Sequence, residues 1–401
     1  MKPQIKLFLQ IAACFLLLFC VIEVLARLAY TVRSDVEQLR EQKPNIWFRY
    51  SPIVGWEAIP GFKGKIAPYG YREFDDRGFL ESDHDKASER APNTVLFIGD
   101  SNTFGYGVTT LSSFAGVTEQ LLPDTRTVNL GIIGYTSYQG RKILEKYLSQ
   151  VRPAAVVASF NYNDRRGVRP GEEDSPVHFQ KVYDSAQSGI RRINEALKWL
   201  YIYRGMVVIM RRVGLLGDQE PIDKLVPRVD EKHYRENLIS IVEQTNLAGV
   251  PLIFILLRDN PLESGYLNSG IEKLEKGEYQ AAIEYFNVVV RANSMYADLG
   301  RVYLSRAYRA MGKEGEAAEA IRAGERVVSL PGGRPIRLDW KYNNIMREVA
   351  SQYNISLVDG ASVLETDPYV FIDFCHFAST GHRKVAELLA IELAKKIKPA
   401  R

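Results

Sequence analysis

Ser101 follows the apolar run Thr94-Val-Leu-Phe-Ile98 and the pair Gly99-Asp100, and its hydroxyl is the first candidate for chemistry in this chain. The run is apolar and β-branched, which predicts a strand buried on both faces that turns into a helix at Ser101. A hydroxyl there lies at the carboxyl end of a sheet, the edge where open α/β folds bind ligands. The N–H of Ser101 would then lie at a helix N-terminus, where negative charge is favoured. A nucleophilic serine that passes through an oxyanion needs this setting, although a serine that only caps a helix shows the same local pattern.

Three further short motifs of candidate functional residues each follow a predicted strand. They contain Gly131 and Gly134, then Asn161, Asn163 and Asp164, and finally Asp373 and His376. Serine, glycine, asparagine and histidine therefore occur in this order along the chain. The order resembles that of the SGNH (GDSL-type) hydrolase superfamily, which is named for these four residues, and the resemblance covers all four motifs. It implies the fold of that superfamily and hydrolysis of carboxylic esters.

The resemblance implies a role for each of five residues. Ser101 matches the nucleophile, His376 the general base and Asp373 the carboxylate that orients the imidazole. The oxyanion hole is matched by the N–H of Ser101, the N–H of Gly134 and the side-chain amide of Asn163; Gly134 is preferred because the second glycine of its motif takes the loop position. The physical chemistry agrees, because a hydroxyl needs a base that titrates near neutral pH, and an Asp can hold that base in the required tautomer.

Motifs for other chemistries are missing from the sequence. It has no Gly-x-Ser-x-Gly elbow, no Gly-x-Gly-x-x-Gly, no P-loop, no His-Glu-x-x-His and no paired cysteines, so we expect neither a cofactor nor a metal. The remaining histidines are isolated, and surface or capping roles are expected for His84, His178, His233 and His382. Cys14 and Cys20 lie in the first apolar segment, and Cys375 is expected to be a small filler beside His376.

The composition is that of an ordinary globular protein. The 401 residues are 46% hydrophobic and 25% charged, and the length favours a core domain with insertions. The net charge of +4 is too small and too diffuse to indicate a nucleic-acid partner.

The N-terminal segment 7–26 is almost wholly apolar, interrupted only by Gln10 and Glu23. About 20 residues of helix span a bilayer core, so residues 1–30 are predicted to form an uncleaved transmembrane anchor. Val24-Leu-Ala26 also makes a cleaved signal peptide conceivable, but the apolar run is longer than the usual 7–15 residues of such a peptide. We therefore expect a membrane-anchored protein with its catalytic domain outside the cytoplasm, in the periplasm or the extracellular space.

Residues 31–90 are predicted to be a polar tether followed by an aromatic-rich extension. Aromatic residues interleaved with Gly and Pro, such as Trp47, Gly55-Trp56 and Pro60-Gly61, indicate short strands and turns that pack on the core. A platform for sugar rings is the functional alternative.

Residues 91–401 are predicted to form the hydrolase domain. Five strands are expected at 94–98, 127–131, 155–160, 250–257 and 355–359, with helices that include 137–150, 342–353 and 381–397. Strands that alternate with helices predict a three-layer α/β/α fold around a parallel sheet.

Two insertions interrupt this domain. Residues 165–230 contain a basic amphipathic stretch that could pack on the domain, close over the site or lie on an anionic membrane. Residues 265–330 contain a recurrence after 35 positions, of Gly277-Glu-Tyr-Gln-Ala-Ala282 as Gly312-Lys-Glu-Gly-Glu-Ala317. The glycine and alanine spacing is similar to the tetratricopeptide pattern, which predicts an all-α repeat and makes residues 265–330 the candidate site for a protein partner. A plain four-helix insertion is the alternative.

The sequence thus predicts a serine ester hydrolase. An acetyl or short acyl ester, carried by a small molecule or by a glycan or lipid of the cell envelope, is the expected substrate. The alternatives are an O-acyltransferase that uses the same triad on an exported polysaccharide, and a partner-binding scaffold with a vestigial site.

Overall fold

A computed structural model describes most of the chain. The described residues are 14, 17–27, 47–66, 70–80, 91–122, 124–189, 197, 200–212, 225–292, 296–325, 339–365 and 368–397. They belong to two compact units, the smaller made of 1–44 and 183–219 and the larger of 45–182 and 220–401.

The larger unit is built on a parallel five-stranded sheet. In chain order its strands are β5 (Asn93–Gly99), β6 (Thr125–Asn129), β7 (Ala155–Ser159), β10 (Leu252–Leu256) and β11 (Ser356–Asp359). All five predicted strands are present. The second ends earlier than expected because the N–H of Gly131 turns back to Asn129 Oδ1 at 2.8 Å.

The strand order across the sheet is β11-β10-β7-β5-β6. β5 therefore lies between β6 and β7. The next strand in the sequence, β6, is added on one side of β5, and the later strands β7, β10 and β11 are added on the other side. In open α/β sheets this change of direction opens a crevice at the carboxyl ends of the strands, where ligands bind. The residues after β5, β6 and β7 are thereby brought to one edge.

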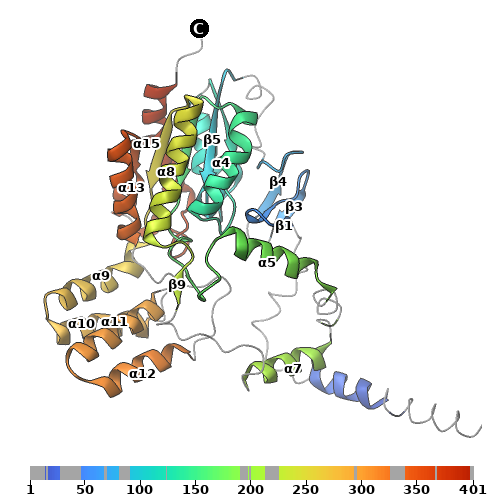
Figure 1. The fold of residues 1–401 in the computed structure, drawn as a ribbon, viewed down its shortest axis with the longest axis vertical. Helices are drawn as coiled ribbons and strands as arrows, with labels where there is room; N and C mark the ends of the chain where they lie inside the picture. The colour runs from blue at the N-terminus through green and yellow to red at the C-terminus, as the bar shows by residue number, and fades with distance from the viewer. Residues whose placement is uncertain are drawn as a thin grey trace, which may run out of the picture. The chain divides into compact units, whose positions relative to one another are not determined.

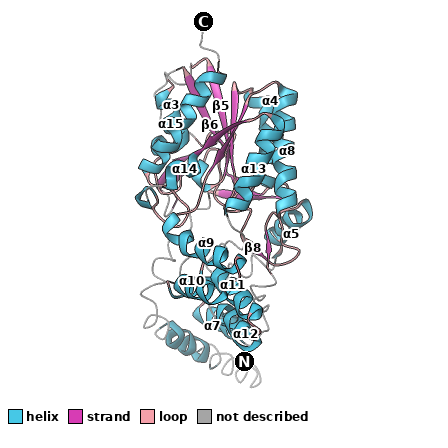
Figure 2. Cartoon of the chain, turned by 90° about the vertical axis from the view of Figure 1, so that its left-hand side faces the viewer, coloured by secondary structure: helices cyan, strands magenta, loops and turns pink. Residues whose placement is uncertain are grey.

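Helices cover both faces of the sheet, so the predicted three layers are present (Figure 2). One face carries α3 (Phe114–Leu121), α14 (Gly360–Glu365) and α15 (Ser379–Lys396), and the other carries α4 (Ser137–Val151), α8 (Glu231–Ala248) and α13 (Asp339–Tyr353). Alternate side chains of β5 enter the two cores: Leu96 and Ile98 pack on the α4 side, and Val95 and Phe97 on the α3 side. Each such fully buried side chain stabilises the fold by about 1.5–3 kcal/mol.

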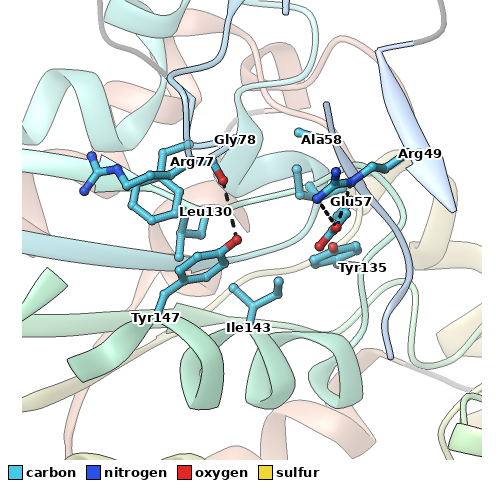
Figure 3. A pocket seen from close by; sticks show the side chains of 11 residues that line it. Arg49, Glu57, Ala58, Arg77, Gly78, Leu130, Tyr135, Ile143 and Tyr147 are labelled. Atoms are coloured by element: carbon cyan, nitrogen blue, oxygen red, sulfur yellow. Dashed lines mark hydrogen bonds and ion pairs between the residues drawn. The ribbon is translucent and has the colours of Figure 1, made fainter. Parts of the chain in front are cut away.

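The aromatic-rich extension forms two antiparallel hairpins. They are β1 (Phe48–Ser51) with β2 (Gly55–Ala58), and β3 (Lys63–Ile66) with β4 (Gly70–Glu73). The ring of Trp47 lies 5.9 Å from that of Phe104 in the hydrolase domain. Tyr147 of α4 donates a hydrogen bond to the carbonyl of Arg77 (Figure 3). These contacts agree with the expected packing of the extension on the core.

The described part of the first insertion contains β8 (Gly167–Val168), β9 (Val226–Pro227) and α5 (Pro176–Gln187). β8 and β9 pair antiparallel. Of the predicted basic stretch, residues 190–196, 198, 199, 213 and 214 lie outside the described residues, whereas 197 and 200–212 lie within them.

The described residues of the second insertion form four helices that stack one after another (Figure 1). They are α9 (Pro261–Glu275), α10 (Tyr279–Arg291), α11 (Ala297–Ala310) and α12 (Glu314–Glu325). Gly277 and Gly312, the recurring glycines, both have a positive φ, of 76° and 72°, just before α10 and α12. The helices share a hydrophobic core of their own around Phe286. Their identity as tetratricopeptide repeats stays a prediction.

In the smaller unit, residues 17–27 are helical and contact α7 (Tyr201–Arg212). Glu23, which interrupts the apolar segment, accepts hydrogen bonds from the N–H groups of Tyr201 and Ile202 at 2.9 and 3.0 Å. Among the described residues, no helix has the length and apolarity to cross a membrane. Residues 1–13, 15, 16 and 28–30 of the predicted anchor and the tether 31–44 lie outside them.

Candidate active site

Ser101 begins the single helical turn α2 (Ser101–Phe104) directly after β5. Asp100 caps this turn by accepting a hydrogen bond from the N–H of Asn102 at 2.9 Å. Burial raises the pKa of Asp100 to about 6 against the opposing effect of that hydrogen bond. Gly99 has no room for a side chain, because a Cβ would lie 2.0 Å from Thr103 Oγ1. In the Gly-Asp-Ser motif, Gly99 therefore allows close packing against Thr103, Asp100 caps the helical turn and Ser101 supplies the hydroxyl.

The hydroxyl of Ser101 faces the imidazole of His376. His376 Nε2 lies 2.8 Å from Ser101 Oγ, and His376 Nδ1 lies 2.7 Å from Asp373 Oδ2. An ionised carboxylate only accepts hydrogen bonds, so Nδ1 carries the ring proton and Nε2 is free to accept the serine proton. The three side chains thus form a line along which a proton can leave the serine.

The carboxylate of Asp373 also accepts two backbone hydrogen bonds. Its Oδ1 receives the N–H groups of Cys375 at 2.9 Å and of His376 at 2.8 Å. Burial alone would raise the pKa of Asp373, but the hydrogen bond from the His376 ring and these N–H groups lower it below its usual value. The carboxylate is therefore ionised at neutral pH.

The loop that carries Asp373 and His376 is held by two asparagines of other segments. Asn102 Nδ2 donates to the carbonyl of Cys375 at 3.0 Å. Asn260, which follows β10, donates its N–H to the carbonyl of Phe374 at 2.8 Å. Both bonds place the histidine relative to the serine.

Two further residues, Tyr106 and Cys375, lie next to the imidazole of His376. The ring of Tyr106 stacks on the imidazole with centroids 3.7 Å apart and planes 11° apart. Cys375 is buried, and burial raises the pKa of its thiol well above the usual value. A thiol held in its protonated form is a poor nucleophile, which agrees with its expected role as a filler.

Gly134 lies in the loop after β6 with a φ of +83°, a conformation that favours glycine. A Cβ at this position would lie 3.1 Å from the Trp56 ring. Asn163, in the turn after β7, donates its Nδ2 to the carbonyl of Tyr135 at 3.0 Å and so joins the two loops. The N–H of Gly131 is already bonded to Asn129, which agrees with the choice of the second glycine.

Three donors at this edge are available to a ligand. Within the described residues, the N–H groups of Ser101 and Gly134 have no hydrogen-bond acceptor. The amide of Asn163 has a second N–H besides the one given to Tyr135. All three belong to segments that leave the carboxyl edge of the sheet, where an oxyanion would need them.

The histidines outside the site occupy varied positions. His382 is fully buried and has the capping role among the two that were expected, because its Nδ1 accepts the N–H of Phe114, the first residue of α3, at 3.2 Å. His233 is exposed beside Asp230 at the start of α8, His178 is half-buried in α5, and His84 lies outside the described residues.

Asp373, Cys375 and His376 are also the group of potential metal ligands that the described residues contain. Both ring nitrogens of His376 already have a hydrogen-bond partner, Nδ1 with Asp373 and Nε2 with Ser101. The arrangement therefore fits proton transfer better than metal coordination.

Sequence reasoning missed Asn102, Tyr106 and Asn260 as neighbours of the site. Asn102 directly follows the Gly-Asp-Ser motif and Tyr106 lies five positions after Ser101, and that closeness was the available signal. Asn260 had none, since its partner carbonyl lies more than a hundred positions away and is brought close only by the pairing of β10 and β11.

One protein-family model matches part of this chain. Residues 97–291 match the model of the GDSL-like Lipase/Acylhydrolase family, a match that includes Ser101, Gly134 and Asn163 and ends before Asp373. Curated proteins yield no match.

Distant likenesses are found among solved structures. An alpha/beta hydrolase enzyme from the metagenome of Lake Arreo, Spain, is 14% identical over 77% of this chain and 98% of its own, with a TM-score of 0.37. A lipase/acylhydrolase from Enterococcus faecalis is 14% identical over 77% and 99%, with a TM-score of 0.36. A variant of Axe2, an acetyl xylan esterase from Geobacillus stearothermophilus, is 14% identical over 78% and 98%, with a TM-score of 0.37. These likenesses are too distant to indicate a substrate.

Proposed function

We propose that this chain, an ester-hydrolysing enzyme with a GDSL-like lipase/acylhydrolase domain at residues 97–291, works through Ser101, His376 and Asp373. The observation that carries this proposal is the continuous hydrogen-bonded line from Ser101 Oγ through the imidazole to Asp373, with distances of 2.8 and 2.7 Å. A nucleophile, a base within reach and a group that orients the base are the three parts of this catalytic arrangement.

The reaction begins when Ser101 Oγ attacks the carbonyl carbon of the ester and its proton passes to His376 Nε2. The tetrahedral intermediate collapses, the alcohol leaves with that proton, and the acyl group remains on Ser101. Water then attacks the acyl-enzyme with His376 as its base, and the carboxylic acid leaves while Ser101 regains its proton. Asp373 stays ionised throughout and stabilises the imidazolium.

The negative oxygen of both tetrahedral intermediates is assigned to three donors. These are the N–H of Ser101, the N–H of Gly134 and the free amide N–H of Asn163. Removal of one such donor typically slows turnover about 10²–10³-fold.

The substrate is proposed to be an acetyl or short acyl ester on a glycan or lipid of the cell envelope. The family match supports an acyl ester as the substrate class, because the description of that family names lipases and acylhydrolases.

The proposed location is the outer side of a membrane, with segment 7–26 as the anchor. The support is the composition and length of that segment: it is almost wholly apolar, and a helix of about 20 residues spans the hydrocarbon core of a bilayer.

The test of the chemistry is covalent labelling. A fluorophosphonate probe should label the full-length protein, Ser101→Ala should abolish both labelling and hydrolysis of p-nitrophenyl acetate, and Ser112→Ala of the neighbouring turn should leave both unchanged. Labelling that survives Ser101→Ala would place the nucleophile elsewhere. Faster release of p-nitrophenol when a sugar alcohol is added, with acylated sugar as product, would indicate an acyltransferase.

A further inference from the structure

Three successive carbonyl groups after β6 are each bound by a side chain from another segment. The pairs are Trp56 Nε1 with Ile133 O at 3.2 Å, Arg228 Nη1 with Gly134 O at 2.7 Å, and Asn163 Nδ2 with Tyr135 O at 3.0 Å. Asn163 belongs to the motifs that the sequence singled out. Trp56 lies in β2 of the N-terminal extension, and Arg228 directly follows β9 in the first insertion.

We propose that Trp56 and Arg228 are positioning residues that hold the oxyanion donor, the N–H of Gly134, in its working direction. The inference rests on the proposed function, because it concerns the donor assigned there. Neither side chain is assigned a contact with the substrate, and both act through the backbone of Gly134.

Trp56 acts on the peptide that carries the donor. The N–H of Gly134 and the carbonyl of Ile133 belong to one planar unit and point in opposite directions. A hydrogen bond from the Trp56 indole to that carbonyl therefore sets the direction of the N–H. It also polarises the peptide, which makes the N–H a stronger donor.

Arg228 acts on the next peptide, through the carbonyl of Gly134 itself. The two peptides meet at the Cα of Gly134, where φ is +83°. Glycine has the widest conformational freedom of all residues, so the orientation of Gly134 is fixed only when hydrogen bonds restrain the peptide on each side of it. Trp56 and Arg228 supply one such hydrogen bond each.

Both side chains are themselves fixed. Arg228 is paired with Asp174 through Nε at 3.0 Å and Nη2 at 2.8 Å, and only 7% of its side chain is exposed. Its guanidinium lies 5.6 Å from the centroid of the Trp56 ring. Tyr135 returns a hydrogen bond from its hydroxyl to the carbonyl of Trp56 at 2.7 Å. A donor held by fixed groups needs no reorganisation when the oxyanion forms.

The expected signature is a loss of turnover without a loss of substrate binding. The N–H of Gly134 is needed by the oxyanion and not by the ground-state ester, so its misplacement should lower kcat and leave KM almost unchanged. The affinity for phenylboronic acid, which forms a tetrahedral adduct with an active-site serine, should fall by the same factor as kcat.

The experiment uses two substitutions in the full-length chain, with p-nitrophenyl acetate as substrate. Trp56→Phe keeps an aromatic ring beside Arg228 and removes the indole N–H. Arg228→Lys keeps a positive charge beside Asp174, but an ammonium group lacks the planar guanidinium that donates to both Asp174 and the carbonyl of Gly134. Each should lower kcat about 5–30-fold, less than the loss of a whole oxyanion donor, with KM changed by less than about twofold.

Matched controls are Trp47→Phe, next to β1 in the same extension, and Arg141→Lys, on α4. Among the described residues, the side chains of Trp47 and Arg141 have no hydrogen bond and no ring contact with residues 133–135. Both variants should therefore keep the parental kcat and boronic acid affinity. Melting curves establish that each variant is folded, and because the two test variants reach the loop from different segments, one folded variant suffices.

The outcomes separate the inference from the proposed function. A parent enzyme whose turnover does not depend on Ser101 would overturn both. A parent that works through Ser101, with Trp56→Phe and Arg228→Lys at the level of their controls, would overturn the inference alone. A rise in KM without weaker boronic acid binding would also overturn it, since this would indicate general damage to the site.

Discussion

Asp373 accepts backbone hydrogen bonds with Oδ1 and a hydrogen bond from the His376 imidazole with Oδ2. The spacing of three positions makes this possible, because the N–H of His376 and its ring both lie within reach of the same side chain. The ring orientation of His376 and the fold of its loop therefore depend on one residue.

We predict that Asp373 and His376 behave as one unit in catalysis. Asp373→Ala and His376→Ala should each lower kcat for p-nitrophenyl acetate by about 10³-fold or more, and the double variant should lose little beyond the worse single variant. Steady-state kinetics of the three variants and the parent measure this coupling. Losses that multiply in the double variant would show that the two residues act independently.

At the scale of elements, a buried histidine joins α15 to α3. His382 Nδ1 accepts the N–H of Phe114, the first residue of α3, and Ser113 Oγ accepts the N–H of Gly116 in the same turn. Burial, with a smaller effect of His376, lowers the pKa of His382 from 6.5 to about 3. The folded protein therefore holds this ring neutral where the unfolded chain would protonate it.

The sign of the pH effect follows from this difference. Between pH 6.5 and about 3 the unfolded chain binds one more proton at His382 than the folded protein does. Its contribution to the free energy of unfolding should thus fall by up to about 1.4 kcal/mol for each pH unit of acidification in this window.

His382→Asn tests the prediction, since it keeps an acceptor near Nδ1 and removes the titrating group. The variant should be less stable than the parent at pH 7.5 by about 1–3 kcal/mol, and its stability should fall less steeply towards pH 4. Urea unfolding followed by circular dichroism at several pH values gives both quantities. Parallel pH profiles for the two proteins would contradict the assignment.

At the scale of the whole molecule, the four-helix insertion is joined to the hydrolase core through a buried polar cluster. Tyr296, just before α11, donates its hydroxyl to Asp259, and Asp259 pairs with the fully buried Arg165 at 2.7 Å. Arg165 in turn donates its Nε to Asn161 at 2.6 Å. A buried ion pair needs such partners, because each unsatisfied polar group costs stability.

We predict that Tyr296→Phe weakens this junction and leaves the chemistry almost intact. Loss of the hydroxyl should destabilise the protein by about 1–3 kcal/mol, while turnover of p-nitrophenyl acetate should change by less than about threefold. Tyr308→Phe, elsewhere in the same helical stack, is the control and should change neither. Thermal unfolding and steady-state kinetics measure the effect. A variant as stable as the control would show that the junction does not depend on Tyr296.

The proposed location leads to a prediction about export. A reporter that is active only outside the cytoplasm, fused after residue 35, should be active, and the full-length protein should stay in the membrane fraction after a high-salt wash. Recovery of a soluble chain whose N-terminus lies near Arg27 would establish cleavage, and an inactive reporter would contradict export.

The sequence by itself determined the parts of this protein that depend on local patterns. Apolar, β-branched runs placed all five strands to within about two residues, and the residues that follow them placed Ser101, Gly134 and Asn163 at one edge of the sheet. Such patterns are readable because a strand buried on both faces needs apolar residues throughout, and parallel strands end at a common edge.

Only the tertiary structure decided which distant groups hold the site in place. The strand order β11-β10-β7-β5-β6 and the packing of the N-terminal hairpins bring Asn102 to the carbonyl of Cys375 and Trp56 to that of Ile133. These partners lie 273 and 77 positions apart, and their carbonyls belong to the backbone, which has the same chemistry at every residue. No side-chain pattern can mark such an acceptor, so its partner becomes known only when the chain is folded.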